Sequence, residues 1–226
     1  MQLSSKKILE EGEILHFDKP LTWSSFKLVK YVKKFSKAKK VGHAGTLDPL
    51  ATGVMIICLG KATKKIEQLQ ILPKVYSGII RLGSTTPCFD LEQAIDFTYS
   101  TSHITQEAII NCAKSFVGEQ FQVPPIFSAV KVNGNRAYKL AREGEIPKLN
   151  PKLITITSFE ITKILDVDVY FKIACGKGTY IRSIARDFGV ALGSGAHLAK
   201  LVRESVGDFS IDNCIDLEAF KAVEII

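Results

Sequence analysis

The chain has 226 residues, of which 46% are hydrophobic and 23% charged, a composition that excludes a disordered protein and is typical of a globular fold. Its N-terminal residues lack the apolar stretch of a secretion signal, and the apolar run 54–59 is too short to cross a bilayer, so we expect a cytoplasmic protein with no membrane association. Lys and Arg exceed Asp and Glu by 30 to 23, and the net charge of +7 suits a polyanionic partner.

The first predicted element is a basic helix. Ser24 or Ser25 can cap a helix that runs to about Phe35, because its apolar residues fall on one stripe and its lysines on the rest. No acidic residue occurs between Asp18 and Asp48. The lysines of this stretch are Lys27, Lys30, Lys33, Lys34, Lys37, Lys39 and Lys40. Taken alone, such a run is as often a solvated face as a binding surface.

Two strands and a second helix follow. Residues 54–59 are predicted as a buried strand, and residues 76–82 as another with Tyr76 on one face. Residues 83–97 lack periodicity and read as an excursion long enough to be functional. A helix is predicted over residues 105–116, closed by Gly118.

The second half mixes the same element types. Strands are predicted over 129–132, 154–165, 169–175 and 198–206, a turn at Asn133-Gly134, and helices over 137–142, 181–188 and 217–223. No repeat or long linker interrupts the chain, so we expect one domain over residues 1–226. Because strands outnumber helices and several are joined by tight turns, the predicted fold class is α+β, with a mainly antiparallel sheet flanked by helices.

The five cysteines bear on cofactors. Cys58, Cys88, Cys112, Cys175 and Cys214 are odd in number, scattered and never spaced as CxxC, which argues against a disulfide framework and against a zinc site. No metal or organic cofactor is implied.

The most informative segment is the loop GHAGTLDPLATG at residues 42–53, where three glycines and a proline surround one carboxylate. Glycines permit positive φ and close backbone approach, and Pro49 drives Asp48 out of the helical region. Asp48 is therefore presented on a stiff loop. An isolated Asp-Pro is more often a turn whose carboxylate caps nearby backbone N–H groups.

This loop resembles the hallmark motif of the TruB family of bacterial tRNA pseudouridine synthases. Further segments resemble the family in the same order: DKPLTWSS at 18–25, KVYSGIIRLGSTT at 74–86, VPPIFSAVKVNGNRAY at 123–138, GKGTYIRSIARDFG at 176–189 and GAHLAKLVRES at 195–205. The resemblance implies the pseudouridine synthase fold and isomerisation of the T-loop uridine at tRNA position 55, in which uracil is detached, turned and rejoined through C5.

That chemistry explains why one carboxylate can suffice. The detached uracil is retained, so Asp48 can serve as nucleophile toward the sugar or the base, or as the base that permits elimination to a glycal. The sequence leaves these routes open.

The resemblance also implies roles for other residues. Arg182 is expected to pair with Asp48, and Tyr76 to stack on the target base. Tyr180 and Leu201 match positions that line the uracil pocket, and His43 matches a residue that helps to hold the flipped nucleotide. Lys19 is either a phosphate contact or a brace for the catalytic loop.

The expected partner is tRNA, bound through its T-arm, with the lysine run lying under its backbone. Residues 83–97 match a mobile segment that clamps this arm, although TTPCFDLEQAID departs from the family's usual sequence there. We expect a monomer with no obligatory protein partner and no C-terminal RNA-binding PUA domain.

Three alternatives remain. A non-catalytic tRNA-binding or tRNA-folding module could have kept this fold, although Asp48, Tyr76 and Arg182 are all present. A guide-RNA-dependent pseudouridine synthase shares the loop motif. A nucleotide-phosphate enzyme is disfavoured, because neither GxxxxGK[ST] nor GxGxxG follows a strand.

Overall fold

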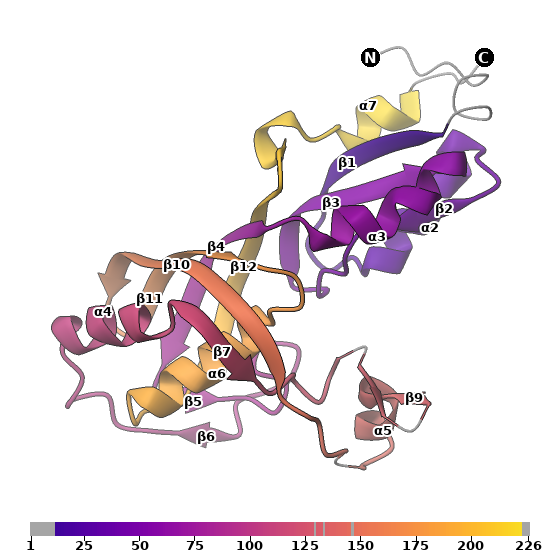
Figure 1. Cartoon of the computed structure of the whole chain (residues 1–226). Coiled ribbons are helices and arrows are strands. Elements are labelled where there is room, and N and C mark those ends of the chain that lie inside the picture. Colours follow the sequence, from indigo (N-terminus) through magenta and orange to yellow (C-terminus); the bar gives the residue numbers. More distant parts are fainter. Residues whose placement is uncertain (1–11, 129, 133, 146, 223–226) are drawn as a thin grey trace. The chain divides into compact units, whose positions relative to one another are not determined.

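The computed structural model describes residues 12–222 except 129, 133 and 146 (Figure 1). Contacts divide the chain into two compact units, Met1–Tyr76 with Leu201–Ile226 and Ser77–Lys200, called unit 1 and unit 2 below. Their boundaries fall inside two strands, β4 (Lys74–Leu82) and β12 (Ala196–Val206). The single domain expected over residues 1–226 stays a prediction.

The sheet of unit 1 is built around β3. This strand (Ala51–Leu59) pairs antiparallel with β1 (Glu13–Lys19) and β2 (Val41–His43), and parallel with β12. A short strand, β13 (Phe209–Ser210), pairs antiparallel with β12. Parallel pairing places Leu201 opposite Ala51 and Arg203 opposite Gly53, which brings β12 beside the end of the Asp48 loop.

Both faces of β3 are covered, which explains its continuous apolar sequence. Met55 and Ile57 pack with the apolar stripe of helix α2 (Ser25–Ser36) in one core cluster. Val54 and Ile56 alternate with them and pack in a second cluster on the other side. The predicted basic helix is confirmed, with Ser24 as its cap, because the Lys27 N–H donates to Ser24 Oγ at 3.1 Å.

Unit 1 is completed by short helices. Two of them, the 3₁₀ helix η1 (Gly60–Lys65) and α3 (Ile66–Ile71), continue from β3. The others, η2 (Ile211–Asn213) and α7 (Leu217–Ala222), follow β13, and Phe220 of α7 packs edge-on against Phe17 of β1 at 5.2 Å between ring centroids.

Unit 2 has a sheet with helices packed against it. Its strand order is β4, β11 (Asp168–Cys175), β10 (Lys152–Leu165) and β7 (Gly118–Gln122), with β10 antiparallel to β11 and to β7. Helices α4 (Gln106–Ser115) and α6 (Ile181–Ala191) pack against this sheet (Figure 1). Phe116 at the end of α4 and Phe188 of α6 pack ring against ring with Phe159 of β10, which in turn packs against Phe171 of β11.

Smaller elements complete unit 2. The predicted excursion at 83–97 contains β5 (Ser84–Thr85), which pairs with β6 (Phe97–Thr98). Strands β8 (Lys131–Val132) and β9 (Asn135–Arg136) precede α5 (Ala137–Arg142). The predicted start of a strand at residue 129 and the turn residue 133 lie outside the described residues.

The α+β class with a mixed, mainly antiparallel sheet is confirmed, and the main predicted helices and strands are present to within a few residues. Strands β1, β2 and β7 were not predicted. No described helix is long and apolar enough to cross a membrane.

Candidate active site

The loop that carries Asp48 is anchored through its backbone at successive residues. Ser25 Oγ both donates to the Leu47 carbonyl and accepts from the Leu47 N–H, each at 2.9 Å. The Asp48 carbonyl accepts from the Ala51 N–H at 3.1 Å, and the Pro49 carbonyl from the Thr22 N–H at 2.9 Å. Because these bonds use backbone groups, they fix the loop without using the Asp48 carboxylate.

Arg203 anchors the N-terminal side of the same loop from inside unit 1. Its side chain is buried and donates from Nη2 to the Gly45 carbonyl and from Nη1 to the Thr46 carbonyl, each at 3.3 Å. Its Nε donates to the Val54 carbonyl at 2.7 Å. With these contacts, every residue from Gly45 to Pro49 has a backbone group held by a hydrogen bond.

Close approach of β12 to β3 depends on Gly53. Its φ is +103°, and a Cβ built there would lie 2.2 Å from the Arg203 carbonyl oxygen. Only glycine fits this position without displacing the backbone that carries Arg203.

Lys19 is fully buried, and its ammonium is enclosed by carbonyl oxygens. Nζ donates to Pro20 at 2.9 Å, to Trp23 at 2.6 Å and to Pro49 at 3.3 Å. Burial lowers the pKa of Lys19 to about 8, although the nearby negative charges of Asp48 and Asp18 act in the opposite direction. These contacts tie Lys19 to the Asp48 loop at Pro49, and the choice between the two roles that the sequence left open stays a prediction.

The other predicted residues of unit 1 lie on strands. His43 ends β2, and burial lowers its pKa, so the neutral imidazole is favoured. No hydrogen-bond partner of its buried Nδ1 occurs among the described residues. Tyr76 is buried on β4, and Leu201 is buried on β12 opposite Ala51.

Arg182 is buried in unit 2 on the first turn of α6. Its Nη1 donates to the Cys88 carbonyl at 3.2 Å and its Nη2 to the Phe127 carbonyl at 3.0 Å. Nε lies 3.6 Å from Asp90 Oδ2, and both side chains are 6% exposed. This is an ion pair with very little access to solvent, so each charge depends on the other.

Asp90 is itself held in place. Its Oδ1 accepts from the Cys88 thiol and from the Glu92 N–H, each at 3.0 Å. Its carbonyl accepts from Thr86 Oγ1 at 2.6 Å. Asp90 therefore supplies a fixed negative charge to Arg182.

Tyr180 precedes α6 as its N-cap residue and is oriented by one side-chain amide. Gln122 Oε1 accepts from the Tyr180 N–H at 2.8 Å, and Gln122 Nε2 donates to the Tyr180 carbonyl at 3.1 Å. Gln122 is 3% exposed, so both bonds are shielded from water. The pairing expected between Asp48 and Arg182 joins residues of different units and stays a prediction.

Four contributing residues were missed by sequence reasoning: Ser25, Asp90, Gln122 and Arg203. Arg203 had a detectable signal, because it stands two residues after the buried Leu201 in a predicted strand. Gln122 had none, because its apolar neighbours Phe121 and Val123 are exposed and its strand was not predicted. Asp90 stands in the aperiodic excursion, where nothing indicated burial. Among the described residues, no group of three or more His, Cys, Asp and Glu side chains could hold a metal ion.

Comparison with known families finds a match over residues 33–181 to the TruB family pseudouridylate synthase, N-terminal domain. A protein of Bacteroides fragilis named tRNA pseudouridine synthase B is 52% identical over 217 residues, which are 93% of each chain. A Flavobacterium johnsoniae protein of the same name is 49% identical, over 93% of this chain and 95% of the relative.

Solved structures share the fold. A Cbf5-Nop10-Gar1 complex matches with a TM-score of 0.71 and 30% identity over 92% of this chain and 52% of the other. An H/ACA RNP bound to a substrate RNA containing 2'-deoxyuridine matches with a TM-score of 0.69 and 27% identity over 94% of this chain and 53% of the other. This chain thus spans about half the length of the matching chain in each of these structures.

Proposed function

This chain belongs to the TruB family of pseudouridylate synthases and is an isomerase, and we propose that it converts the T-loop uridine at tRNA position 55 to pseudouridine with Asp48 as its essential carboxylate. The reaction breaks the N1–C1' bond, turns the uracil and forms a C5–C1' bond. C5 loses its proton, and N1 gains one, so that substrate and product are isomers.

One observation carries the assignment of Asp48. The loop from Gly45 to Pro49 is held at every residue by Arg203, Ser25, Ala51 and Thr22, and Lys19 adds a further bond. A loop that only connected two strands would not need this number of buried anchors. Rigid positioning is what a single carboxylate needs in order to act on a nucleotide held out of its stack.

The remaining residues then take supporting parts. Arg182 orients the Asp48 carboxylate, Tyr76 stacks on the base, and Tyr180 and Leu201 line the uracil pocket. His43 contacts the RNA beside the flipped nucleotide. Lys19 positions the loop from behind and does not contact phosphate, because its ammonium is enclosed by carbonyl oxygens.

Free tRNA is favoured over a guide-RNA-dependent substrate by the degree of similarity. Relatives named tRNA pseudouridine synthase B are 49–52% identical over more than nine-tenths of both chains. The matching chain of the Cbf5-Nop10-Gar1 complex is 30% identical, and this chain spans 52% of it. We therefore propose that the T-arm alone suffices as substrate and that the enzyme acts as a monomer.

The test is release of tritium from C5-labelled uridine in a T-arm transcript. We expect release by the wild type and none by Asp48→Asn at equal RNA occupancy. Asp212→Asn is the matched control, because it makes the same change at an exposed residue of η2 and should leave release unchanged. If the wild type binds the RNA without releasing tritium, the non-catalytic module becomes the better explanation.

The clamp role of residues 83–97 is a separate proposal. Leu91, Ile95 and Phe97 of this region are 45%, 52% and 65% exposed, and exposed apolar side chains are available to pack against an RNA loop. Limited proteolysis with and without tRNA tests the proposal. Equal cleavage in this segment under both conditions would contradict it.

A further inference from the structure

One stretch of the chain has a net positive charge larger than that of the whole protein. Residues 19–66 contain eleven lysines and a single acidic residue, Asp48, which gives this stretch a net charge of +10. The rest of the chain therefore carries −3 of the total +7. Lys19 is buried, whereas the other ten lysines are exposed.

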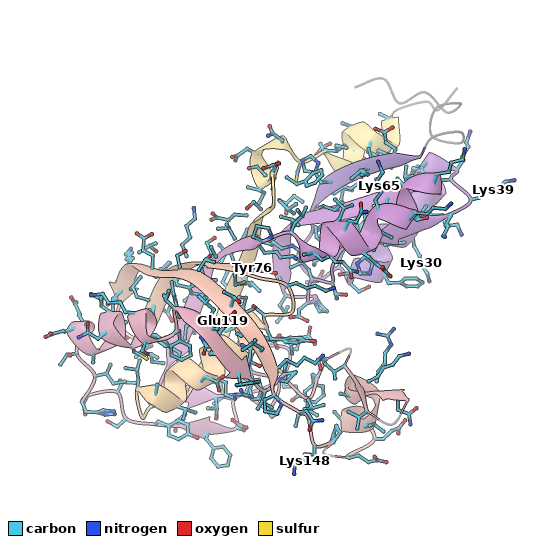
Figure 2. The ribbon with its side chains drawn as sticks, viewed as in Figure 1. Lys30, Lys39, Lys65, Tyr76, Glu119 and Lys148 are labelled. Atoms are coloured by element: carbon cyan, nitrogen blue, oxygen red, sulfur yellow. The ribbon has the colours of Figure 1, made fainter. Side chains whose placement is uncertain are left out.

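Folding joins the two lysine-rich parts of this stretch. The Lys40 carbonyl accepts from the Gly60 N–H at 2.8 Å, and Val41 pairs with Leu59 across β2 and β3. The turn after α2 therefore lies beside η1, which has lysines of its own. We call these exposed lysines of unit 1 the lysine platform: Lys27, Lys30, Lys33, Lys34, Lys37, Lys39, Lys40, Lys61, Lys64 and Lys65. Figure 2 labels Lys30, Lys39 and Lys65, which all belong to unit 1.

Three lysines of α2 form a row whose ammonium groups are supported by aromatic rings. Lys27, Lys30 and Lys34 are spaced by three and four residues, which places them on one side of the helix, about one turn or 5 Å apart. Their Nζ atoms lie over the rings of Trp23, Phe26 and Phe35, at 4.5, 4.7 and 5.3 Å from the respective centroids. Such cation–π contacts restrict side chains that otherwise move freely, so less entropy is lost when they bind an anion.

The packing of α2 separates an RNA partner from a membrane. A helix that binds a bilayer must offer an apolar face, but Leu28, Val29 and Val32 of α2 are buried in the core of unit 1. What the helix offers to solvent is a regular row of cations, with Phe26 as its one exposed large apolar side chain, too little for an apolar face. This arrangement suits the repeating phosphates of a nucleic acid backbone.

The platform lies close to the Asp48 loop within the same unit. Only β2, three residues long, separates Lys40 from Ala44, a span of about 10 Å. An RNA that presents its loop to Asp48 therefore has its adjoining stem within reach of these lysines.

We propose that the lysine platform binds the phosphate backbone of the duplex stem adjoining the target loop, as an anchoring surface that raises affinity without taking part in the chemistry. This inference rests on the proposed function, since it takes the T-arm as the RNA that is bound. Each phosphate contact that the platform provides should add to the salt dependence of binding.

The experiment measures the affinity of a fluorescent T-arm hairpin for the full chain between about 50 and 200 mM salt, the range over which phosphate contacts change affinity strongly. The platform variant is K27Q/K30Q/K34Q. The matched control is K114Q/K152Q/K163Q, which removes three exposed lysines of unit 2, one of them also over a ring, Tyr170. Circular dichroism confirms that both variants are folded.

We expect the slope of log K against log salt to fall by about 2 in the platform variant, since each lost contact removes roughly 0.7–0.9. The control slope should be unchanged, and the platform variant should need a higher RNA concentration than the control variant for half-maximal tritium release. Equal slopes in the two variants would overturn the inference. A platform variant that no longer binds anionic vesicles but binds the RNA as the wild type does would also overturn it. A wild type that shows the salt effect but releases no tritium would refute the proposed function alone.

Discussion

Replacing Asp90 with asparagine removes the negative charge that faces the buried Arg182 guanidinium, with almost no change in side-chain shape. Both side chains are 6% exposed, and the charged atoms are 3.6 Å apart. Loss of one partner from a buried ion pair costs about 3–5 kcal/mol, because the remaining charge stays out of water. Arg182 keeps the carbonyls of Cys88 and Phe127 as acceptors, and the proposed pairing with Asp48 leaves it a second negative charge, so we expect a loss of stability of about 3 kcal/mol, the lower end of that range.

The control is Asp168→Asn, which breaks a shorter but more exposed pair. Arg81 donates to the two Asp168 oxygens at 2.7 and 2.8 Å, and the side chains are 44% and 19% exposed. Exposed pairs contribute about 0–1 kcal/mol, because solvent screens them. Distance alone ranks Asp168 above Asp90, whereas burial ranks them in the opposite order.

Two measurements decide between these rankings. Urea unfolding gives the free energy of unfolding, and a melting temperature about 6–12 °C lower accompanies a 3 kcal/mol loss in a chain of this size. In the tritium assay, we expect Asp90→Asn to lower kcat by about 100-fold, since small displacements of a positioning group are enough to do so. A larger loss of stability in Asp168→Asn than in Asp90→Asn would refute the reasoning from burial.

Three further predictions concern the anchors of the Asp48 loop. Gly53→Ala should destabilise unit 1 by about 3 kcal/mol or more, because its φ is positive and its Cβ would clash with β12. The control is Gly118→Ala, which has a similar φ of +117° but no atom within 4 Å of the added Cβ, so it should lower stability by only about 1 kcal/mol. Equal melting temperatures of the two variants would count against the clash. Ser25→Ala leaves two buried backbone groups of Leu47 without their partner, so we expect the free energy of unfolding in urea to fall by about 2 kcal/mol and kcat to fall as well. An unchanged kcat would show that this anchor does not position Asp48. Burial lowers the pKa of Lys19 from 10.5 to about 8, so between these pH values the unfolded chain binds more protons at this residue, and Lys19 contributes a rise of about 3 kcal/mol in the free energy of unfolding with pH. Thiols whose pKa values are raised by burial act in the opposite direction, so the measurement is the difference between the wild type and Lys19→Met, and parallel pH profiles of the two would contradict the prediction.

The amino-acid sequence was sufficient for the local features of this protein. Ser24 and the apolar stripe behind it determine helix α2, because a cap and a period of 3.6 are encoded by neighbouring residues. The same holds for the stiff loop around Asp48, where three glycines and Pro49 limit the backbone whatever packs around it. Strand β2 was missed, since three residues carry too little pattern to be separated from loop. Strand β1 was missed although Leu15 and Phe17 alternate with polar or less buried residues along its seven positions.

Only the tertiary structure decided which distant groups support the site. Arg203 follows Asp48 by more than 150 residues, and parallel pairing of β12 with β3 brings its guanidinium to the Gly45 and Thr46 carbonyls. Burial of Asp90 is likewise a result of packing, because it stands in no apolar pattern that indicates it. Lys19 follows Leu15 and Phe17 on the buried face of β1, but the carbonyl oxygens that accept from its ammonium are supplied by the tertiary structure. Charge and periodicity are properties of neighbouring residues, whereas desolvation and hydrogen bonding depend on which surfaces the fold brings together.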